Sequence, residues 1–309
     1  MLDVGGERMN QVEIVMAVQK MQEYIDKQIL NEITLKQLSN VAGYSSWHAA
    51  KIFKDIVGKT PFEYIRALRL TQAALTLRDN KYKIIDVALD FVFDSHEGFT
   101  RAFSKEFGLP PKKYSQSKPP IQLFMPDKVY DTYRAFQKGG NKMSENKTTK
   151  TVFVQVIERE RRKVLIKRAV KATDYFEYCE EVGCDIWALL TSVKEALYEP
   201  IGMWLPKHLI LEGTSQYVQG VELSLSYSNT VPDGYELIEL PPCKMMVFQS
   251  EPYNDDDFMQ EIGDVWSTIE KFNPTIYGFE WAPENAPRFQ LVPMGYRGYI
   301  EARPVTALK

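Results

Sequence analysis

The spacing of apolar residues changes near residue 150 and divides the chain into two parts. Before this point, apolar side chains recur every three or four residues, which is typical of amphipathic helices. From Thr151 onwards they alternate with polar residues in short runs rich in β-branched and aromatic side chains, which is typical of strands. The pattern predicts an all-α N-terminal domain followed by an α+β C-terminal domain.

One sequence unit occurs twice in the first 120 residues. Residues 53–64 and 103–114 share the frame F-x-x-x-V/F-G-x-x-P-x-x-Y at an offset of fifty, and residues further upstream match at an offset of forty-nine. The one-residue slip falls near the turn between two predicted helices. We expect each copy to be a helix-turn-helix.

Local signals place the ends of these helices. Thr34 to Gln37 has the pattern of a capping box, and Thr60 to Glu63 combines a cap, a first-turn proline and an acidic third position. Gly43 and Gly58 are helix stops. The expected helices cover residues 35–43, 46–57, 61–77, 84–91 and 95–107, and the third would join the two copies rigidly.

The second helix of each copy has an outward face that suits a DNA major groove. In the first copy the outward residues are Trp47, Ala50, Lys51 and Lys54, and in the second they are His96, Glu97, Thr100, Arg101 and Ser104. Lys51 and Arg101 can reach guanine edges or phosphates, and Trp47 can pack on a sugar or a thymine methyl. Taken singly, these residues also fit a solvated face with one stray aromatic, but the repeat favours DNA binding.

Two segments carry a family resemblance. Gly43-Tyr44-Ser45-Ser46-Trp47-His48 in the first copy and Phe107-Gly108-Leu109-Pro110-Pro111-Lys112-Lys113-Tyr114 in the second make residues 10–118 similar to the DNA-binding domain of AraC/XylS-family transcription regulators. The resemblance implies DNA contacts at Trp47, Ala50, Lys51, His96, Glu97, Gly98 and Arg101. Val92 departs from the family pattern because glycine usually stands there, which implies a rearranged turn or local strain.

Residues 119–150 are predicted to link the two domains. Residues 139–150 are polar, contain two glycines and indicate a flexible tether. The apolar side chains of residues 121–137 indicate that this stretch packs on one of the domains.

Charge and composition narrow the function classes. Residues 1–120 carry 17 Lys and Arg against 14 Asp and Glu, whereas residues 151–309 carry 15 against 24, so only the first part favours a polyanion. Phosphate-loop, histidine-pair and nucleophile-elbow motifs are absent, and Cys179, Cys184 and Cys243 form no metal-ligand pattern. We therefore expect no enzymatic activity, metal or cofactor. The lack of a long apolar segment or a secretion signal predicts a cytoplasmic protein.

Strands and two helices alternate in the C-terminal part. The expected helices cover residues 174–198 and 255–272, and the expected strands cover 151–157, 164–170, 217–227, 235–240, 244–250, 275–281 and 296–304. Glu280 stands between Phe279 and Trp281, so it lies on the opposite face of its strand. By itself, this pattern favours an edge-strand carboxylate that faces water.

A second resemblance changes that interpretation. Through Leu205-Pro206, Gly213-Thr214, Tyr217 and Gly220-Val221-Glu222, residues 151–309 resemble the GyrI-like, or BmrR-type, effector-binding domain. The resemblance implies two βαββ halves around a central pocket with a buried glutamate among aromatic side chains. It assigns the glutamate to Glu280 and the pocket walls to Trp281, Tyr277, Trp187 and Trp204. Such a pocket suits a lipophilic cation.

Together these features predict a bacterial, sequence-specific transcription regulator. Its expected partners are double-stranded DNA, RNA polymerase and a small lipophilic, cationic effector, and activation is the expected sign of regulation. Two alternatives stay open: a protein that sequesters a small molecule, and a hydrolase of small electrophilic compounds with Glu280 as its base. The sequence does not determine the oligomeric state, the effector or the operator.

Overall fold

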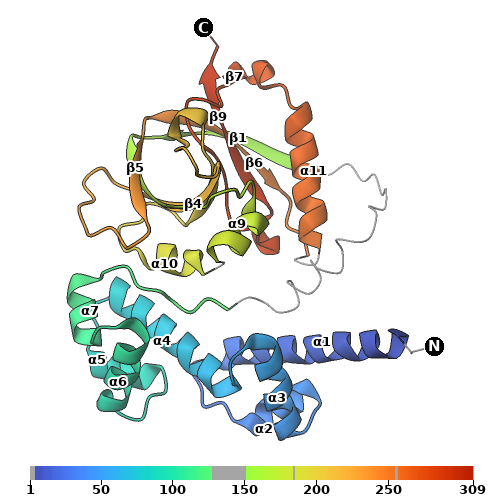
Figure 1. Cartoon of the computed structure of the whole chain (residues 1–309), viewed down its shortest axis with the longest axis vertical. Helices are drawn as coiled ribbons and strands as arrows, with labels where there is room; N and C mark the ends of the chain where they lie inside the picture. Colours follow the sequence, from blue (N-terminus) through green and yellow to red (C-terminus); the bar gives the residue numbers. More distant parts are fainter. Residues whose placement is uncertain (1–3, 127–150, 184, 255–256, 309) are drawn as a thin grey trace. The chain divides into compact units, whose positions relative to one another are not determined.

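The computed structural model describes residues 4–126, 151–183, 185–254 and 257–308, which form two compact units (Figure 1). One unit contains residues 4–118 and 122–126, and the other contains residues 119–121 and those from 151 onwards. The first is helical and the second contains an antiparallel sheet, as the change of hydrophobic period predicts. Within the described residues, no helix has both the length and the hydropathy that a membrane span requires.

Among the residues that the structure describes, seven helices build the first unit. They are α1 (Val4–Gln28), α2 (Leu35–Ala42), α3 (Ser46–Val57), α4 (Pro61–Asp79), α5 (Ile84–Asp90), α6 (His96–Phe107) and α7 (Pro111–Ser117). Helix α2 contacts α3, α5 contacts α6, and α4 runs between the two pairs (Figure 1). At 1.5 Å per residue, the 19 residues of α4 span about 28 Å.

Both expected capping boxes are present. The backbone N–H of Thr34 donates to Oε1 of Gln37 at 2.7 Å, and that of Thr60 donates to Oε2 of Glu63 at 2.8 Å. The bond from Thr60 also holds the pKa of the Glu63 carboxyl below its ordinary value. These bonds satisfy amide groups that have no partner within the helix, so the starts of α2 and α4 follow from local sequence.

Residues 121–126 are the described part of the stretch that we expected to pack on one domain. The Phe124 ring lies edge-on to Tyr64 with ring centroids 5.3 Å apart, and its backbone N–H donates to Oγ1 of Thr71 at 2.8 Å. Ile121 belongs to the second unit, where its N–H donates to Oγ of Ser192 at 2.9 Å. The flexible tether predicted over residues 139–150 lies outside the described residues.

Val92 adopts a left-handed backbone conformation, with φ of 61°. Gly43 holds the matching place in the first copy, with φ of 74°. The hydrogen bond from Phe93 N–H to the Ala88 carbonyl, at 2.9 Å, matches the bond from Tyr44 N–H to the Ser39 carbonyl, at 3.1 Å. The second turn is therefore strained rather than rearranged, because a β-branched residue here brings its Cβ close to the carbonyl oxygen.

Replacing Val92 by glycine should raise the unfolding free energy by about 1 kcal/mol, because it removes the steric cost of the left-handed conformation. Urea unfolding followed by far-ultraviolet circular dichroism measures the change. The matched control is Gly43→Val, where an added Cβ meets no atom within 4 Å and the backbone alone causes the expected loss. A Val92→Gly variant less stable than the parent protein would show that this turn is not strained.

The second unit consists of an antiparallel sheet and three described helices. The strands are β1 (Val152–Arg159), β2 (Arg162–Arg168), β3 (Ile201–Trp204), β4 (Tyr217–Leu223), β5 (Glu236–Leu240), β6 (Cys243–Ser250), β7 (Phe279–Trp281), β8 (Arg288–Gln290) and β9 (Ile300–Ala307). The helices are α9 (Tyr175–Val182), α10 (Ile186–Ser192) and α11 (Phe258–Lys271). The described strands form one sheet in the order β1-β6-β9-β8-β3-β4-β2-β5, with β7 on β9.

The sheet contains two similar parts. In one, β4 lies between β2 and β3, and in the other β9 lies between β6 and β8. In each part a helical segment follows the first strand: α9 and α10 after β2, and α11 after β6. The antiparallel pair β3–β8 joins the two parts, with Trp204 opposite Arg288 and Gly202 opposite Gln290.

The structure corrects several expected elements of this unit. The helix predicted over residues 174–198 is two helices, α9 and α10, because Gly183 with φ of 100° ends the first. The strand predicted over residues 275–281 begins with a 3-10 helix over Pro274–Tyr277. Strands β3 and β8 were not predicted, because runs of four and three residues are too short to show alternation.

Candidate ligand cleft and DNA-contacting face

A cleft of about 580 Å³ opens where β3 and β8 join the two parts of the sheet. Its lining includes Trp204, Lys207, Trp281, Arg288, Arg303 and Pro304. A second cleft, of about 690 Å³, has no aromatic ring in its lining other than the imidazole of His208. The first cleft combines aromatic surface with charged groups, which is the usual make-up of a small-molecule site.

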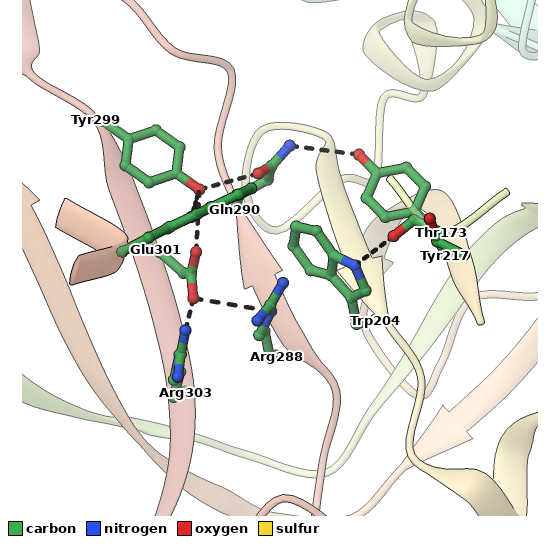
Figure 2. Close-up of polar contacts among 9 residues, drawn as sticks. Thr173, Trp204, Tyr217, Arg288, Gln290, Tyr299, Glu301 and Arg303 are labelled. Atoms are coloured by element: carbon green, nitrogen blue, oxygen red, sulfur yellow. Dashed lines mark hydrogen bonds and ion pairs between the residues drawn. The ribbon is translucent and has the colours of Figure 1, made fainter. Parts of the chain in front are cut away.

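The charged centre beside this cleft is Glu301 on β9, whose side chain has no solvent exposure. Figure 2 shows the polar contacts around it. Nε of Arg303 donates to its Oε1 at 2.8 Å, and Nε of Arg288 lies 3.7 Å from the same oxygen. The Tyr299 hydroxyl lies 3.0 Å from Oε2 of Glu301 and 3.0 Å from Oε1 of Gln290. Two cations and a hydroxyl thus compensate the desolvation of one carboxylate.

Arg288 is held mainly by an aromatic ring. Its guanidinium carbon lies 3.8 Å from the centroid of the Trp204 ring, and Nε1 of Trp204 donates to the Thr173 carbonyl at 2.8 Å (Figure 2). Nε of Arg288 is buried and makes no hydrogen bond. Burial lowers the pKa of Arg288 from its ordinary value, with the charge of Glu301 acting against that shift.

Two buried tyrosines extend the polar network. Nε2 of Gln290 donates to the Tyr217 hydroxyl at 3.4 Å, and Nε1 of Trp266 donates to the Tyr299 hydroxyl at 3.1 Å. Burial raises the pKa of Tyr217 and of Tyr299 above the ordinary value, so both phenols stay protonated. A Cβ atom at Gly202 would lie 2.1 Å from the Tyr217 hydroxyl oxygen, so residue 202 must be glycine for the Tyr217 ring to lie where it does.

The outward face of α3 presents an aromatic ring beside a cation. Trp47 is 72% exposed, and Nζ of Lys51 lies 5.5 Å from the centroid of its ring. Lys54 is exposed and Ala50 is partly exposed on the same helix. The expected inward residues Ala49, Ile52 and Phe53 are buried. Ser45 Oγ accepts from the His48 N–H at 3.3 Å and fixes the start of α3.

Helix α6 also has an exposed polar face, but no tryptophan lies on it. His96, Glu97 and Arg101 are exposed, and Gly98 is partly exposed. Thr100 differs from expectation because it is half-buried, and its Oγ1 is buried without a hydrogen-bond partner. Its hydroxyl therefore faces the packed side of the helix.

Comparisons with known proteins identify the domain that contains α3 and α6. Residues 38–117 match the family model of a helix-turn-helix domain. The probable transcription factor PqrA of Proteus vulgaris is 40% identical over 95 residues, which cover 30% of this chain and 78% of PqrA. A probable AraC family transcriptional regulator from Rhodopseudomonas palustris CGA009 is 27% identical, with 32% of this chain and 94% of that one covered and a TM-score of 0.31. The chain belongs to the AraC family of helix-turn-helix transcription regulators.

Other relatives of this AraC-family chain are longer. The right origin-binding protein of Escherichia coli (strain K12) is 40% identical over 99 residues, which cover 29% of this chain and 34% of that protein. The chain thus aligns with about a third of the length of the first curated relatives it matches.

The C-terminal residues that the sequence assigned to a pocket do not come together. Glu280 is exposed on the short strand β7, so its expected burial among aromatic side chains is wrong. Tyr277 is 56% exposed and stacks on Phe272, and Trp187 is buried in α10 outside the cleft lining. Only Trp204 and Trp281 line the cleft. Strand β7 pairs with β9, and Glu280 is its one exposed residue.

Sequence reasoning missed Glu301. The available signal was the spacing of Tyr299, Glu301 and Arg303, which alternation places on one face of a strand. Gln290 and Arg288 gave no such signal, because β8 is three residues long and follows an irregular segment.

Glu301→Gln should lower the unfolding free energy of this AraC-family chain by about 1–3 kcal/mol, because it leaves two partly buried guanidiniums without a counter-charge. Glu280→Gln makes the same chemical change on an exposed strand and should alter stability by less than about 0.5 kcal/mol. Urea unfolding followed by tryptophan fluorescence compares the two. Equal stability of both variants would contradict the assignment of Glu301 as the buried charge.

Proposed function

We propose that this AraC-family chain is a one-component regulator that binds duplex DNA through α3 and α6 and binds a small effector in its C-terminal cleft. The observation that carries the DNA-binding part is the pair of Trp47 and Lys51 on the exposed face of α3. An exposed tryptophan on this face can pack on a sugar or a thymine methyl in a groove. Lys51 beside it can reach guanine or phosphate.

The proposed docking uses both helix pairs of residues 10–118. Helix α4 spans about 28 Å between them, which is close to the 34 Å of one DNA turn. The recognition helices α3 and α6 would therefore enter successive major grooves on one DNA face. Trp47, Ala50, Lys51 and Lys54 would contact one groove, and His96, Glu97, Gly98 and Arg101 the other.

The proposed effector part rests on the cleft and on the two similar parts of the sheet. We interpret these parts as the two βαββ halves of a GyrI-like effector-binding domain, with residues 119–150 as the connection to the DNA-binding domain. The cleft lies at their junction, and Glu301 takes the role of the buried glutamate that we first assigned to Glu280. Trp204 and Trp281 provide its aromatic walls.

We also propose that the chain activates transcription by contact with RNA polymerase. One relative that is 34% identical over 94 residues, AarP of Providencia stuartii, is named an HTH-type transcriptional activator, which supports activation as the sign of regulation. A reporter gene driven by the bound promoter measures the sign of regulation. If reporter expression rises when the gene for this protein is deleted, the protein is a repressor instead.

Lys51→Ala and Arg101→Ala should each weaken specific DNA binding by about 1–3 kcal/mol if each side chain contacts guanine. DNase footprinting on the chain's own and neighbouring promoters locates the site, and fluorescence anisotropy then measures affinity at one fixed salt concentration. Lys20→Ala changes an exposed lysine of α1 and controls for loss of charge. The absence of any protected promoter segment would refute the proposal.

The footprint also tests the two-groove geometry. Protection should cover two successive major grooves, and Arg101→Ala should weaken protection in one of them only. Protection confined to a single groove would show that α6 does not insert into the DNA. The strained turn at Val92 would then be the first feature to test by mutation.

A further inference from the structure

The cleft carries more cationic than anionic groups where a ligand would lie. Its lining includes three cationic residues, Lys207, Arg288 and Arg303, and one acidic residue, Glu284. Glu301 adds one more carboxylate beneath the lining, at 2.8 Å from Nε of Arg303 and 3.7 Å from Nε of Arg288. One buried carboxylate is thus shared by two guanidiniums, so its charge is already balanced before any ligand binds.

The guanidinium of Arg288 is partly exposed to the cleft. This guanidinium stacks on Trp204, its ion pair with Glu301 at 3.7 Å is longer than a hydrogen bond, and the side chain is 32% exposed in the cleft lining. An oxyanion of a ligand in the cleft can therefore accept a charge-assisted hydrogen bond from the exposed part of this guanidinium. A cation placed here would instead face two guanidiniums at close range.

The remaining walls are apolar. Trp204, Leu205, Pro206, Trp281 and Pro283 line the same cleft and offer ring and hydrocarbon surface. A ligand that fits both sets of groups has an acidic end and an apolar body.

We propose that the effector is an amphipathic carboxylate whose oxygens bind Arg288 and Arg303 while its apolar body packs against Trp204 and Trp281. This inference rests on the proposed effector-binding function of the cleft. It reverses the cationic class that the sequence predicted, because that class depended on Glu280 as a buried, uncompensated charge.

The net negative charge of residues 151–309 does not oppose the assignment of an anionic effector. Residues 151–309 carry 24 Asp and Glu against 15 Lys and Arg, which slows the approach of an anion. That field is screened beyond about 8 Å at physiological ionic strength, whereas the two guanidiniums contact the ligand directly. The contact groups therefore decide the preference in the bound state.

Isothermal titration calorimetry of the full chain with octanoate, octanol and octylammonium tests the proposal, because these three probes share one hydrocarbon chain and differ in charge. We expect octanoate to bind roughly tenfold to a hundredfold more tightly than octanol, which is the range for charge-assisted hydrogen bonds. Octylammonium should bind more weakly than octanol.

Arg288→Met keeps an unbranched apolar side chain and removes the charge, so it should reduce octanoate binding to the level of octanol and leave octanol binding nearly unchanged. Arg303→Met should act in the same direction. The control is Arg161→Met, an exposed arginine of the same domain that is paired with Glu239 and lies outside the cleft lining; octanoate affinity should not change.

The outcomes separate the two proposals. Binding of octanol together with equal or tighter binding of octylammonium than octanoate would overturn the anionic class and leave the cleft as an effector site. Octanoate affinity unaffected by both Arg288→Met and Arg303→Met would also overturn it. No binding of any of the three probes would overturn the proposed effector function of the cleft, and this inference with it.

Discussion

The carboxylate of Glu301 is out of contact with solvent, so the fold must supply the groups that balance its charge. Arg303 comes from the same strand and Arg288 from the neighbouring strand β8, which pairs with β9. Because β8 also pairs with β3, Arg288 lies against Trp204 and the two parts of the sheet meet at this point. The compensation of one buried charge therefore fixes the position of the cationic and aromatic walls of the cleft.

The helical unit depends on local rather than long-range constraints. Side-chain caps at Thr34, Ser45, Thr60 and Ser95 start four of its helices. Both turns of the repeated pair use a left-handed residue, glycine in one copy and Val92 in the other. A valine persists in this conformation because the surrounding helices and the bond from Phe93 to Ala88 determine the turn. Repetition of the backbone geometry thus outweighs the preference of a single side chain.

The same contrast explains what the sequence could predict. Caps, helix stops and three-to-four-residue periodicity are local signals, and they correctly placed helices α2 to α6 to within about two residues. Val92 was recognised because glycine usually stands at this place in the family pattern, and Gly43 holds the matching left-handed place in the first copy. In the C-terminal part, the longer strands were found from alternation, although their ends shifted by several residues.

The site could not be predicted in the same way, because its residues meet only through long-range strand pairing. Alternation showed that Glu280 lies on the face opposite Trp281, but not whether that face is covered. Burial of Glu301 requires β8 on one side and β6 on the other. The two unpredicted strands, β3 and β8, are the ones that bring Trp204 and Arg288 together.

A double-mutant cycle between Glu301 and Arg303 tests most directly whether this buried charge cluster organises the domain. Unfolding free energies of the parent protein, Glu301→Gln, Arg303→Met and the double variant give the coupling energy of the pair. The account predicts that the double variant loses less than the sum of the single losses, by about 1 kcal/mol or more. Additive losses, within about 0.3 kcal/mol, would show that the two charges are energetically independent and would contradict the account.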